Sequence, residues 1–205
     1  MIRYFLLLFA GLISCAQFPA KDELLAEAAM PEKDYSAKHT EALAYCKEKK
    51  FSEEYYFLLD MSVHSGKNRF YVYDFKQNKI IDQNLVTHGS CDIPTNYADK
   101  WDKARYSNTD GSHCTSLGKY KIGKRDYSSW GIKVKYWLHG LDASNSNAVA
   151  RVVVLHSWDA VADAEVYPNV SPLSWGCPAV SDNFMKKLDT KLQAAKKPVL
   201  LWIVE

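Results

Sequence analysis

The sequence predicts a mainly β, α+β fold in which a mixed sheet or β-sandwich carries a few flanking helices. Three observations predict this class. Segments rich in aromatic and β-branched residues recur from residue 54 onward, and such residues favour strands. Polar, turn-like breaks separate several of these segments. Two other segments instead repeat apolar or small residues at helical spacing, which favours helices beside the sheet.

Length and composition restrict the class of protein. The chain has 205 residues, of which 47% are hydrophobic, and a formal net charge of +2. This length fits one domain with a short appendage, and this hydrophobic content excludes wholesale disorder. Proteins that bind nucleic acid usually present a basic stripe, so no nucleic-acid partner is expected. The 13 Tyr, 8 Phe and 6 Trp residues suit either a β-rich core or a groove for an extended polar ligand.

The first 15 residues have the features of a bacterial lipoprotein signal peptide. Arg3 provides a positive charge, and the apolar run 5–13 is shorter than the roughly 20 residues that a membrane-spanning helix needs. The segment ends in LISC, which resembles a lipobox and implies cleavage before Cys15 and lipidation of Cys15. The alternative is an ordinary signal peptide cleaved near Ala16. Both interpretations predict export. The lipobox also predicts a lipid anchor on the periplasmic side of the cell envelope, with the outer membrane as the expected destination.

The segment that follows is expected to be a tether. Residues 16–35 are charged and Ala-rich and contain two prolines, a composition typical of a spacer between an anchor and a folded unit. The folded domain is therefore expected over 36–205.

Secondary-structure elements are expected in the following order. A helix is predicted over 36–50, where Ser36 can act as the N-cap and Cys46 faces inward with either Ala42 or Leu43. The strands are predicted over 54–63, 69–75, 80–89, 118–124, 132–141, 150–156 and 199–204. The first three of these form a meander, and the next two form a second pair.

A second helix is predicted after Ser181, a residue type that favours the N-cap. Phe184, Leu188 and Leu192 repeat every four residues and should form its inward face. Pro198 ends this helical region before the last strand.

A histidine and a cysteine occur in the most informative segment. The strand predicted over 150–156 ends at His156, and 17 residues separate His156 from Ser174-Trp175-Gly176-Cys177. A strand end holds a general base rigidly, and Gly176 leaves room for a substrate carbonyl beside the thiol. An imidazole within reach can hold Cys177 as a reactive thiolate. The alternative is ordinary packing, because a lone cysteine is more often a small buried residue.

The remaining cysteines and histidines allow two further interpretations. Cys91 and Cys114 either pair as a disulfide in the oxidising compartment or remain reduced. A metal site would have enough nitrogen and sulfur ligands, but the chain lacks the paired CxxC or HExxH spacing of zinc sites. No metal and no cofactor is therefore expected. The ligands of such a site would be His88, Cys91, His113, Cys114, His156 and Cys177.

The segment from His156 to Cys177 resembles the murein L,D-transpeptidase catalytic domain. The broad family pattern is a His followed at a similar distance by Ser/Thr-His-Gly-Cys. This chain has Trp175 in place of the second His, as in the branch of the family with SWGCPAV at the active cysteine. The resemblance covers about residues 53–185. Three further segments match in the same order, namely LVTHGS at 85–90, ARYSNTDGSHCTSLGKY at 104–120 and LHGLDASNSNAVARVVVLH at 138–156.

This resemblance implies the L,D-transpeptidase fold and a cysteine acyltransferase that acts on peptidoglycan. Cys177 would attack a tetrapeptide stem and form a thioester, with His156 as the base and the backbone carbonyl of Ser157 orienting the imidazole. Backbone N–H groups of Gly176 and Cys177 would form the oxyanion hole. An amine would then resolve the acyl-enzyme, giving a 3-3 cross-link or attachment to another acceptor, including a protein. The alternatives are an L,D-carboxypeptidase that uses water and a non-catalytic cell-wall-binding lipoprotein.

Further substrate contacts are implied by the same resemblance, and each has a structural alternative. The loop residues can be ordinary turns, Trp158 and Trp175 can pack in the core, and Arg151 can pair with Asp142 or Asp159 instead of substrate. The residues implied to bind substrate are His139, Gly140, Ser174, Trp175, Ser116 and Arg151.

Overall fold

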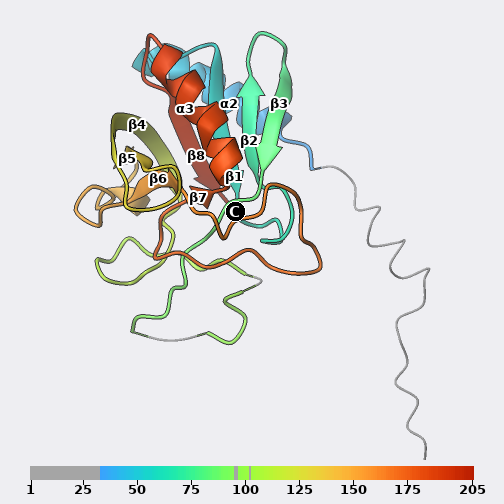
Figure 1. Ribbon diagram of the computed structural model, residues 1–205. Helices are drawn as coiled ribbons and strands as arrows, with labels where there is room; N and C mark the ends of the chain where they lie inside the picture. Colours follow the sequence, from blue (N-terminus) through green and yellow to red (C-terminus); the bar gives the residue numbers. More distant parts are fainter. Residues whose placement is uncertain (1–32, 95–96, 102) are drawn as a thin grey trace, which may run out of the picture. The chain divides into compact units, whose positions relative to one another are not determined.

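The computed structural model of the chain describes residues 33–94, 97–101 and 103–205. The predicted signal peptide, Cys15 and most of the tether lie outside the described residues. Ser36–Glu205 form one compact unit, which Figure 1 shows as a ribbon. Within the described ranges, no helix has the length and apolar character needed to cross a membrane.

One mixed sheet of eight strands dominates this unit, which confirms the mainly β, α+β class. The strand order is β3-β2-β1-β8-β4-β5-β6-β7. The last strand of the chain therefore lies inside the sheet, parallel to β1 and antiparallel to β4. The strands are β1 (Tyr55–Asp60), β2 (Phe70–Asp74), β3 (Lys79–Asn84), β4 (Gly118–Tyr127), β5 (Val134–Gly140), β6 (Val154–Ser157), β7 (Ala179–Val180) and β8 (Leu200–Val204).

The predicted strand pairs are present. β1, β2 and β3 form an antiparallel meander, and β4 pairs with β5 in the same sense. One strand begins later than predicted: the expected strand over 150–156 starts only at Val154, because residues 148–153 form a tight turn. Arg151 consequently lies on this turn and not on a buried strand.

Two helices cover the sheet (Figure 1). α2 (Ser36–Lys49) buries Ala42 and Cys46, which selects Ala42 over Leu43 as the inward partner of Cys46. Ser36 is the first helical residue, so the helix begins one position earlier than an N-cap at Ser36 would place it. α2 stacks His39 on Tyr73, with ring centroids 3.4 Å apart, on one face of the sheet.

α3 (Asp182–Ala194) lies on the other face. Its predicted N-cap is present, because the Ser181 hydroxyl accepts a hydrogen bond from the N–H of Phe184 at 3.3 Å. Phe184 and Leu188 are buried and Leu192 is partly buried, as the spacing predicted. The Phe184 ring packs edge-on against Phe70 of β2, with ring centroids 5.2 Å apart.

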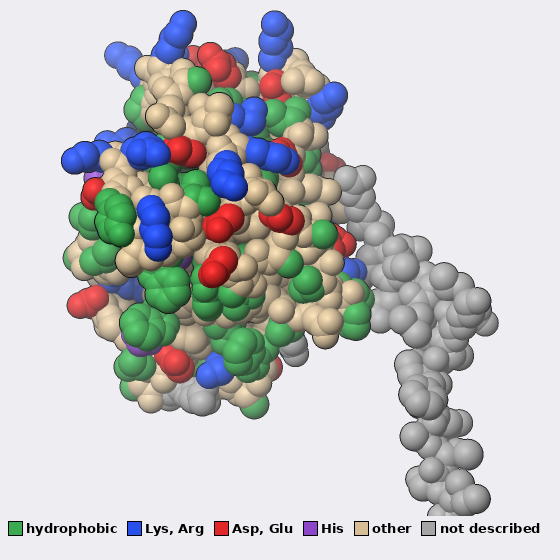
Figure 2. All heavy atoms as spheres, viewed as in Figure 1, with side chains coloured by type: hydrophobic (Ala, Val, Ile, Leu, Met, Phe, Trp, Pro, Cys, Tyr) green, Lys and Arg blue, Asp and Glu red, His purple; other side chains and the backbone are tan. Residues whose placement is uncertain are grey.

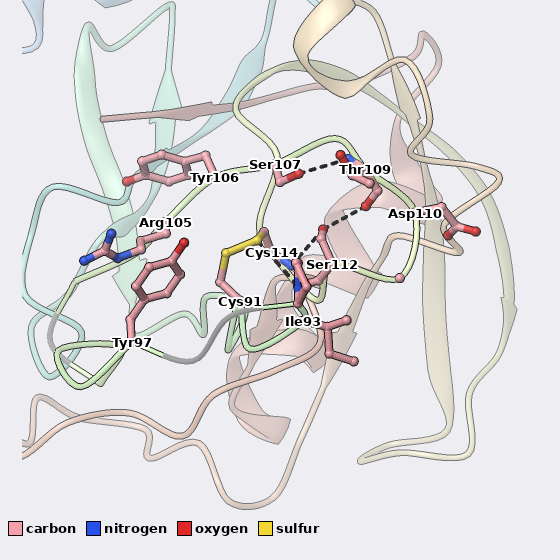
Figure 3. A pocket seen from close by; sticks show the side chains of 12 residues that line it. Cys91, Ile93, Tyr97, Arg105, Tyr106, Ser107, Thr109, Asp110, Ser112 and Cys114 are labelled. Atoms are coloured by element: carbon pink, nitrogen blue, oxygen red, sulfur yellow. Dashed lines mark hydrogen bonds between the residues drawn. A yellow bond between two sulfur atoms is a disulfide. The ribbon is translucent and has the colours of Figure 1, made fainter.

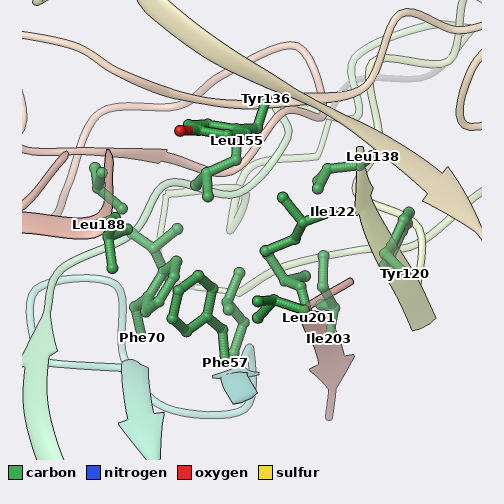
Figure 4. Close-up of a cluster of buried hydrophobic side chains, with 14 of the residues drawn as sticks. Phe57, Phe70, Tyr120, Ile122, Tyr136, Leu138, Leu155, Leu188, Leu201 and Ile203 are labelled. Atoms are coloured by element: carbon green, nitrogen blue, oxygen red, sulfur yellow. The ribbon is translucent and has the colours of Figure 1, made fainter. Parts of the chain in front are cut away.

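The hydrophobic core between the sheet and α3 determines which side of β5 and β6 remains available for a site. Figure 4 shows Tyr136, Leu138 and Leu155 in this core. Strand side chains alternate between faces, so Lys135, and His156 opposite it in the register, project from the other face of the sheet. Figure 2 shows hydrophobic side chains gathering over the loop-rich lower half of the molecule, with Lys and Arg around the upper end.

A further short element is the 3-10 helix η1 (Ala143–Asn145). It follows β5 and packs closely against the end of that strand: a Cβ on Gly140 would lie 1.9 Å from the carbonyl oxygen of Asn145. A glycine is therefore required there for backbone approach.

Candidate active site

The cysteine and histidine singled out by the sequence border one open cavity of about 360 Å³. His156 lies on β6, and Cys177 lies just before β7, which pairs in parallel with β6. The fold therefore brings together two residues that are separated by a long loop. The cavity is lined by Trp130, His156, Trp158, Leu173, Ser174, Trp175 and Cys177.

The imidazole of His156 is fixed by a neighbouring backbone carbonyl. Its Nδ1 atom lies 2.9 Å from the carbonyl oxygen of Ser157. Because a carbonyl only accepts hydrogen bonds, Nδ1 carries the proton and the neutral ring has its lone pair on Nε2. Burial lowers the pKa of His156, the hydrogen bond to Ser157 opposes this effect, and the charge of Lys135 lowers the pKa further.

The sulfur of Cys177 contacts backbone groups beside β6. The N–H of Val154 donates to Sγ at 3.5 Å, and the thiol donates to the carbonyl oxygen of Val152, also at 3.5 Å. In this conformer the thiol is therefore hydrogen-bonded to the backbone and not to His156, although both side chains border the same cavity. The Cys177 residue retains partial exposure.

The surroundings of Cys177 and His156 shift the pKa of each group toward its neutral form. Burial raises the pKa of Cys177, and this effect outweighs the Val154 N–H and the charges of Arg151 and Lys135, which lower it. Since the pKa of His156 is lowered, the proton stays on sulfur. The resting pair is a neutral thiol beside a neutral imidazole, because the low-polarity surroundings disfavour both charged forms.

Val152 has an unusual backbone conformation that directs its carbonyl to the sulfur. Its φ is 56°, in the left-handed region that β-branched residues rarely adopt. The N–H of Val153 donates to the carbonyl of Ala148 at 2.9 Å, and that of Val152 to Val149 at 3.0 Å. This is the pattern that ends a helical turn, where glycine is the usual residue. Strain of this kind commonly occurs at functional sites.

The loop before Cys177 is closed by Ser174. The Ser174 hydroxyl donates to the carbonyl of Cys177 at 2.7 Å and accepts the N–H of Gly176 at 3.2 Å. Thr87 adds a second donor to the same carbonyl at 3.1 Å. Ser174 therefore shapes the loop, although it also borders the cavity.

The two backbone N–H groups expected to form the oxyanion hole differ in their hydrogen bonding in this structure. The N–H of Gly176 is engaged by Ser174, so it is not free to bind an oxyanion in this conformation. Among the described residues, the N–H of Cys177 has no hydrogen-bond acceptor, which leaves it as the available donor of the two. Gly176 has a φ of 102°, and a Cβ there would lie 2.6 Å from the carbonyl oxygen of Cys114. Its requirement for glycine is therefore conformational and steric.

A disulfide joins Cys91 to Cys114, which resolves the alternative left open by the sequence. Figure 3 shows this bond at a second, smaller cavity of about 240 Å³. The carbonyl of Cys114 faces Gly176 and accepts a hydrogen bond from Nη2 of Arg151 at 2.6 Å. The disulfide loop therefore supports the loop that carries the nucleophile.

Arg151 connects several loops, and among the described residues it contacts these loops and not Asp142 or Asp159, the alternative partners that the sequence offered. The guanidinium donates to the carbonyl of Ser107 at 2.9 Å and to the hydroxyl of Ser116, besides its bond to Cys114. A planar guanidinium with several fixed donors suits such a loop junction better than a single carboxylate contact.

Three other residues implied to bind substrate lie outside the main cavity. Ser116 is buried and donates to the carbonyl of Ser107 at 2.8 Å. His139 packs against Gly123, where a Cβ would lie 2.3 Å from its Nε2 atom, and Gly140 packs against η1. Each of these three residues packs against other parts of the protein and does not line the cavity that holds Cys177.

Trp175 is a wall of the groove and not part of the core. Its side chain is 75% exposed, and its indole stacks on the His113 ring, with centroids 4.7 Å apart and planes inclined by 5°. Asp92 orients His113, because its carboxylate lies 2.9 Å from Nδ1 of that ring. Trp158 is half-buried and meets Trp130 edge to face at 5.6 Å.

Several residues of the site were not found by sequence reasoning. Trp130 comes from the turn before β5, far from the segment with the cysteine, and its only sequence signal is a large aromatic residue in a Ser- and Gly-rich turn. Thr87 lies within a segment that resembles the family, without a feature that marks its hydroxyl. The roles of the Val152 carbonyl and of His113 depend on tertiary contacts.

The set of candidate metal ligands is dispersed by the fold. Cys91 and Cys114 are joined to each other, and buried His88 contacts Arg69 at 2.8 Å and the carbonyl of Lys100 at 2.7 Å. Within residues 33–94, 97–101 and 103–205, no three His, Cys, Asp or Glu side chains form a group that could hold a metal ion.

A thiol and an oriented imidazole beside an open cavity define a candidate site for acyl transfer through cysteine. The sequence matches the family model for the L,D-transpeptidase catalytic domain over residues 28–201. Because this match covers most of the chain, the protein belongs to the L,D-transpeptidase catalytic domain family. The family resemblance predicted from the sequence is thereby confirmed. No match was found among curated proteins.

Solved structures, two of them described as L,D-transpeptidases, are similar to the chain. The enzyme from Xylanimonas cellulosilytica is 8% identical, with a TM-score of 0.42, over 78% of this chain and 68% of that structure. The helical cell shape determining protein Pgp2 from Campylobacter jejuni is 16% identical, with a TM-score of 0.42, over 80% of this chain and 54% of that structure. The L,D-transpeptidase from Mycobacterium smegmatis is 9% identical, with a TM-score of 0.42, over 74% and 59%. The chain thus spans only about half of some of these proteins.

Proposed function

We propose that the protein is a peptidoglycan L,D-transpeptidase that works through a Cys177 thioester. Its substrate is the tetrapeptide stem of peptidoglycan, and its product is a 3-3 cross-link or a stem joined to another amine, including a protein acceptor. The observation that carries this proposal is the common cavity of Cys177 and His156, with the imidazole oriented by Ser157. Membership of the L,D-transpeptidase family supports the substrate class.

The first step is transfer of the thiol proton. Rotation of the Cys177 side chain away from its backbone partners Val152 and Val154 brings sulfur toward Nε2 of His156. Nε2 then accepts the proton as sulfur attacks the stem carbonyl. A neutral starting pair suits this general-base step, because charge develops only as the new bond forms.

The tetrahedral intermediate then collapses to the thioester. In this mechanism the N–H of Cys177 stabilises the oxyanion, an effect on the order of 3 kcal/mol per donor in acyl transfer. A second donor requires the Gly176 N–H to exchange its bond to Ser174 for one to substrate. The imidazolium of His156 gives its proton to the leaving amine of D-Ala. An acceptor amine then attacks the thioester, and Cys177 leaves as the thiol.

Export and anchoring form part of this proposal. The LISC segment supports lipidation at Cys15, which would hold the domain at a membrane of the cell envelope. Metabolic labelling with an alkyne fatty acid tests this directly. Label should enter the wild-type protein and be absent from Cys15→Ser, whereas equal labelling of both would contradict anchoring at this residue.

The activity is tested by incubating purified mature protein with disaccharide-tetrapeptides and analysing the products by liquid chromatography and mass spectrometry. The proposal predicts 3-3 dimers with release of one D-Ala per bond formed. Tripeptide without dimer would identify an L,D-carboxypeptidase. Unchanged substrate, together with binding to cell-wall sacculi, would identify a non-catalytic wall-binding protein.

A further inference from the structure

The cavity that holds Cys177 has aromatic walls. Three indoles border it, from Trp130, Trp158 and Trp175. Trp130 is 53% exposed and Trp175 is 75% exposed, so two large aromatic side chains remain in water at the mouth of one site. Tryptophans arranged in this way around a concave site are a common feature of ligand recognition.

Among the residues that the structure describes, no acidic side chain lines this cavity. Besides the three indoles it is lined by Leu173, Ser174 and the reacting pair. A positively charged ligand entering the cavity would therefore meet no carboxylate. The faces of the indoles are the negative surfaces available to it, because an aromatic ring has a quadrupole with a negative face.

One indole is held firmly in place. The His113 ring covers one face of Trp175 at 4.7 Å, nearly parallel to it, and Asp92 fixes His113 from the side at 2.9 Å. Cys91 and Cys114, the neighbours of Asp92 and His113 in the chain, are joined by the disulfide. This support leaves the opposite face of Trp175 for a ligand.

We propose that the three-tryptophan cavity is the binding site for the acceptor, which it holds as an ammonium ion through cation–π contacts. This inference rests on the proposed transpeptidase function and specifies how the acceptor is recognised. It also distinguishes an amine from water, because water has no charge for the indoles to attract.

The proton balance of the transfer is as follows. Neutral His156 takes one proton from the ammonium group, and the freed amine attacks the thioester carbon. The carbon–nitrogen bond forms and the carbon–sulfur bond breaks. Of the two protons that nitrogen loses, one protonates the departing Cys177 thiolate through the imidazole and the other is released to solvent.

Lys135 is the cation whose charge acts on both His156 and Cys177. Its Nζ atom lies 5.1 Å from the centre of the Trp137 ring, on the strand next to β6. This charge repels a second cation, so the attraction must come from the aromatic walls. The same charge adds to the effect of burial, which is the main cause of the lowered pKa of His156.

The test uses the acyl-enzyme formed from purified mature protein and a tetrapeptide donor. Its transfer to an amine stem is measured in the presence of choline or of 3,3-dimethylbutan-1-ol, an uncharged analogue of the same shape. Choline should inhibit transfer about 10- to 30-fold more strongly than the analogue, the range expected for desolvated cation–π contacts. Equal inhibition by both compounds would overturn the inference, since it would show an apolar cavity without preference for charge.

Variants provide a second readout. Trp158→Leu and Trp130→Leu should lower the ratio of amine transfer to hydrolysis about 10-fold or more; this ratio is measured on the acyl-enzyme once it has formed, so it does not depend on the rate of acylation. Trp101→Leu is the matched control, because Trp101 is 47% exposed and lies outside this cavity. An unchanged ratio in both cavity variants would refute the inference alone. A wild-type protein that is never acylated would refute the proposed function, and the acceptor site with it.

Discussion

The Nδ1 atom of His156 donates its proton to the carbonyl oxygen of Ser157 across 2.9 Å. This contact leaves Nε2 as the basic atom of the imidazole and does so without a carboxylate. A neutral partner raises the pKa of the ring less than a charged one would, so burial prevails and the pKa is lowered. The resting state of the site, a thiol beside a neutral imidazole, follows from this choice of partner.

The pH dependence of acylation should report this state. Because the pKa of His156 is lowered from its ordinary value of 6.5 and that of Cys177 is raised, the base stays neutral and the thiol protonated across the neutral range. We expect the second-order rate of Cys177 acylation to fall only in acid, below about pH 6.5, without a decline up to about pH 9. Stopped-flow fluorescence with a carbapenem measures it. A bell-shaped profile with an alkaline decline near pH 8 would instead indicate a thiolate–imidazolium pair.

Substitution of Gly176 should affect both stability and chemistry. In Gly176→Ala the new Cβ would lie 2.6 Å from the carbonyl oxygen of Cys114, at a φ of 102°. We expect a loss of about 1 to 3 kcal/mol in the free energy of unfolding and at least a tenfold slower acylation. Gly111→Ala is the control, because Gly111 also has a positive φ, 70°, but nothing within 4 Å. If both variants acylate at the same rate, contact with Cys114 is not what shapes the loop.

Arg151 should be a positioning residue for the loops around the nucleophile. Arg151→Lys keeps the charge but loses the planar fork that reaches Ser107, Ser116 and Cys114. We expect about 1 to 3 kcal/mol of destabilisation in urea and slower acylation. Arg105→Lys should stay within about 0.5 kcal/mol of wild type, because Arg105 forms an exposed pair with Asp99. If Arg151→Lys has the stability and acylation rate of wild type, a positive charge at this position is enough to hold the loops in place.

Buried His88 should make the fold sensitive to acid. Burial and neighbouring Arg69 lower its pKa from 6.5 to about 4. Between these values the unfolded chain binds the proton that the native state excludes, so stability rises with pH and is lost as pH falls through this window. The shift corresponds to roughly 3 kcal/mol. Urea unfolding from about pH 7 to pH 4 should show a shallower loss in His88→Gln than in wild type. Parallel curves would contradict this assignment.

The fold was largely predictable because its signals are local. The aromatic and β-branched segments became strands, and the spacing of Phe184 and Leu188 placed them on the buried face of α3. The strand order was not predictable, because insertion of β8 between β1 and β4 depends on pairing between segments far apart in the chain. The start of β6 was wrong by four residues, since Val152 adopts a left-handed conformation that its sequence disfavours.

The site was predictable only in part. His156, Ser157 and Cys177 were found because strand-end placement and a short motif identify them, and the fold brings His156 and Cys177 to one cavity. The hydrogen bond between Ser174 and Gly176 and the contacts of Arg151 were not predicted. Hydrogen bonds between loops produce no recognisable pattern of residue spacing in the sequence. Trp130 was missed for the same reason.

The measurement that tests the central claim most directly is the intact mass of the protein after exposure to a carbapenem. Wild type should gain one drug molecule, and peptide mapping should place it on Cys177. Cys177→Ala should gain none while its free energy of unfolding changes by no more than about 1 to 2 kcal/mol, since a partly exposed thiol contributes little packing. A wild-type protein without an adduct, or a Cys177→Ala protein that fails to fold, would contradict the assignment of Cys177 as the nucleophile.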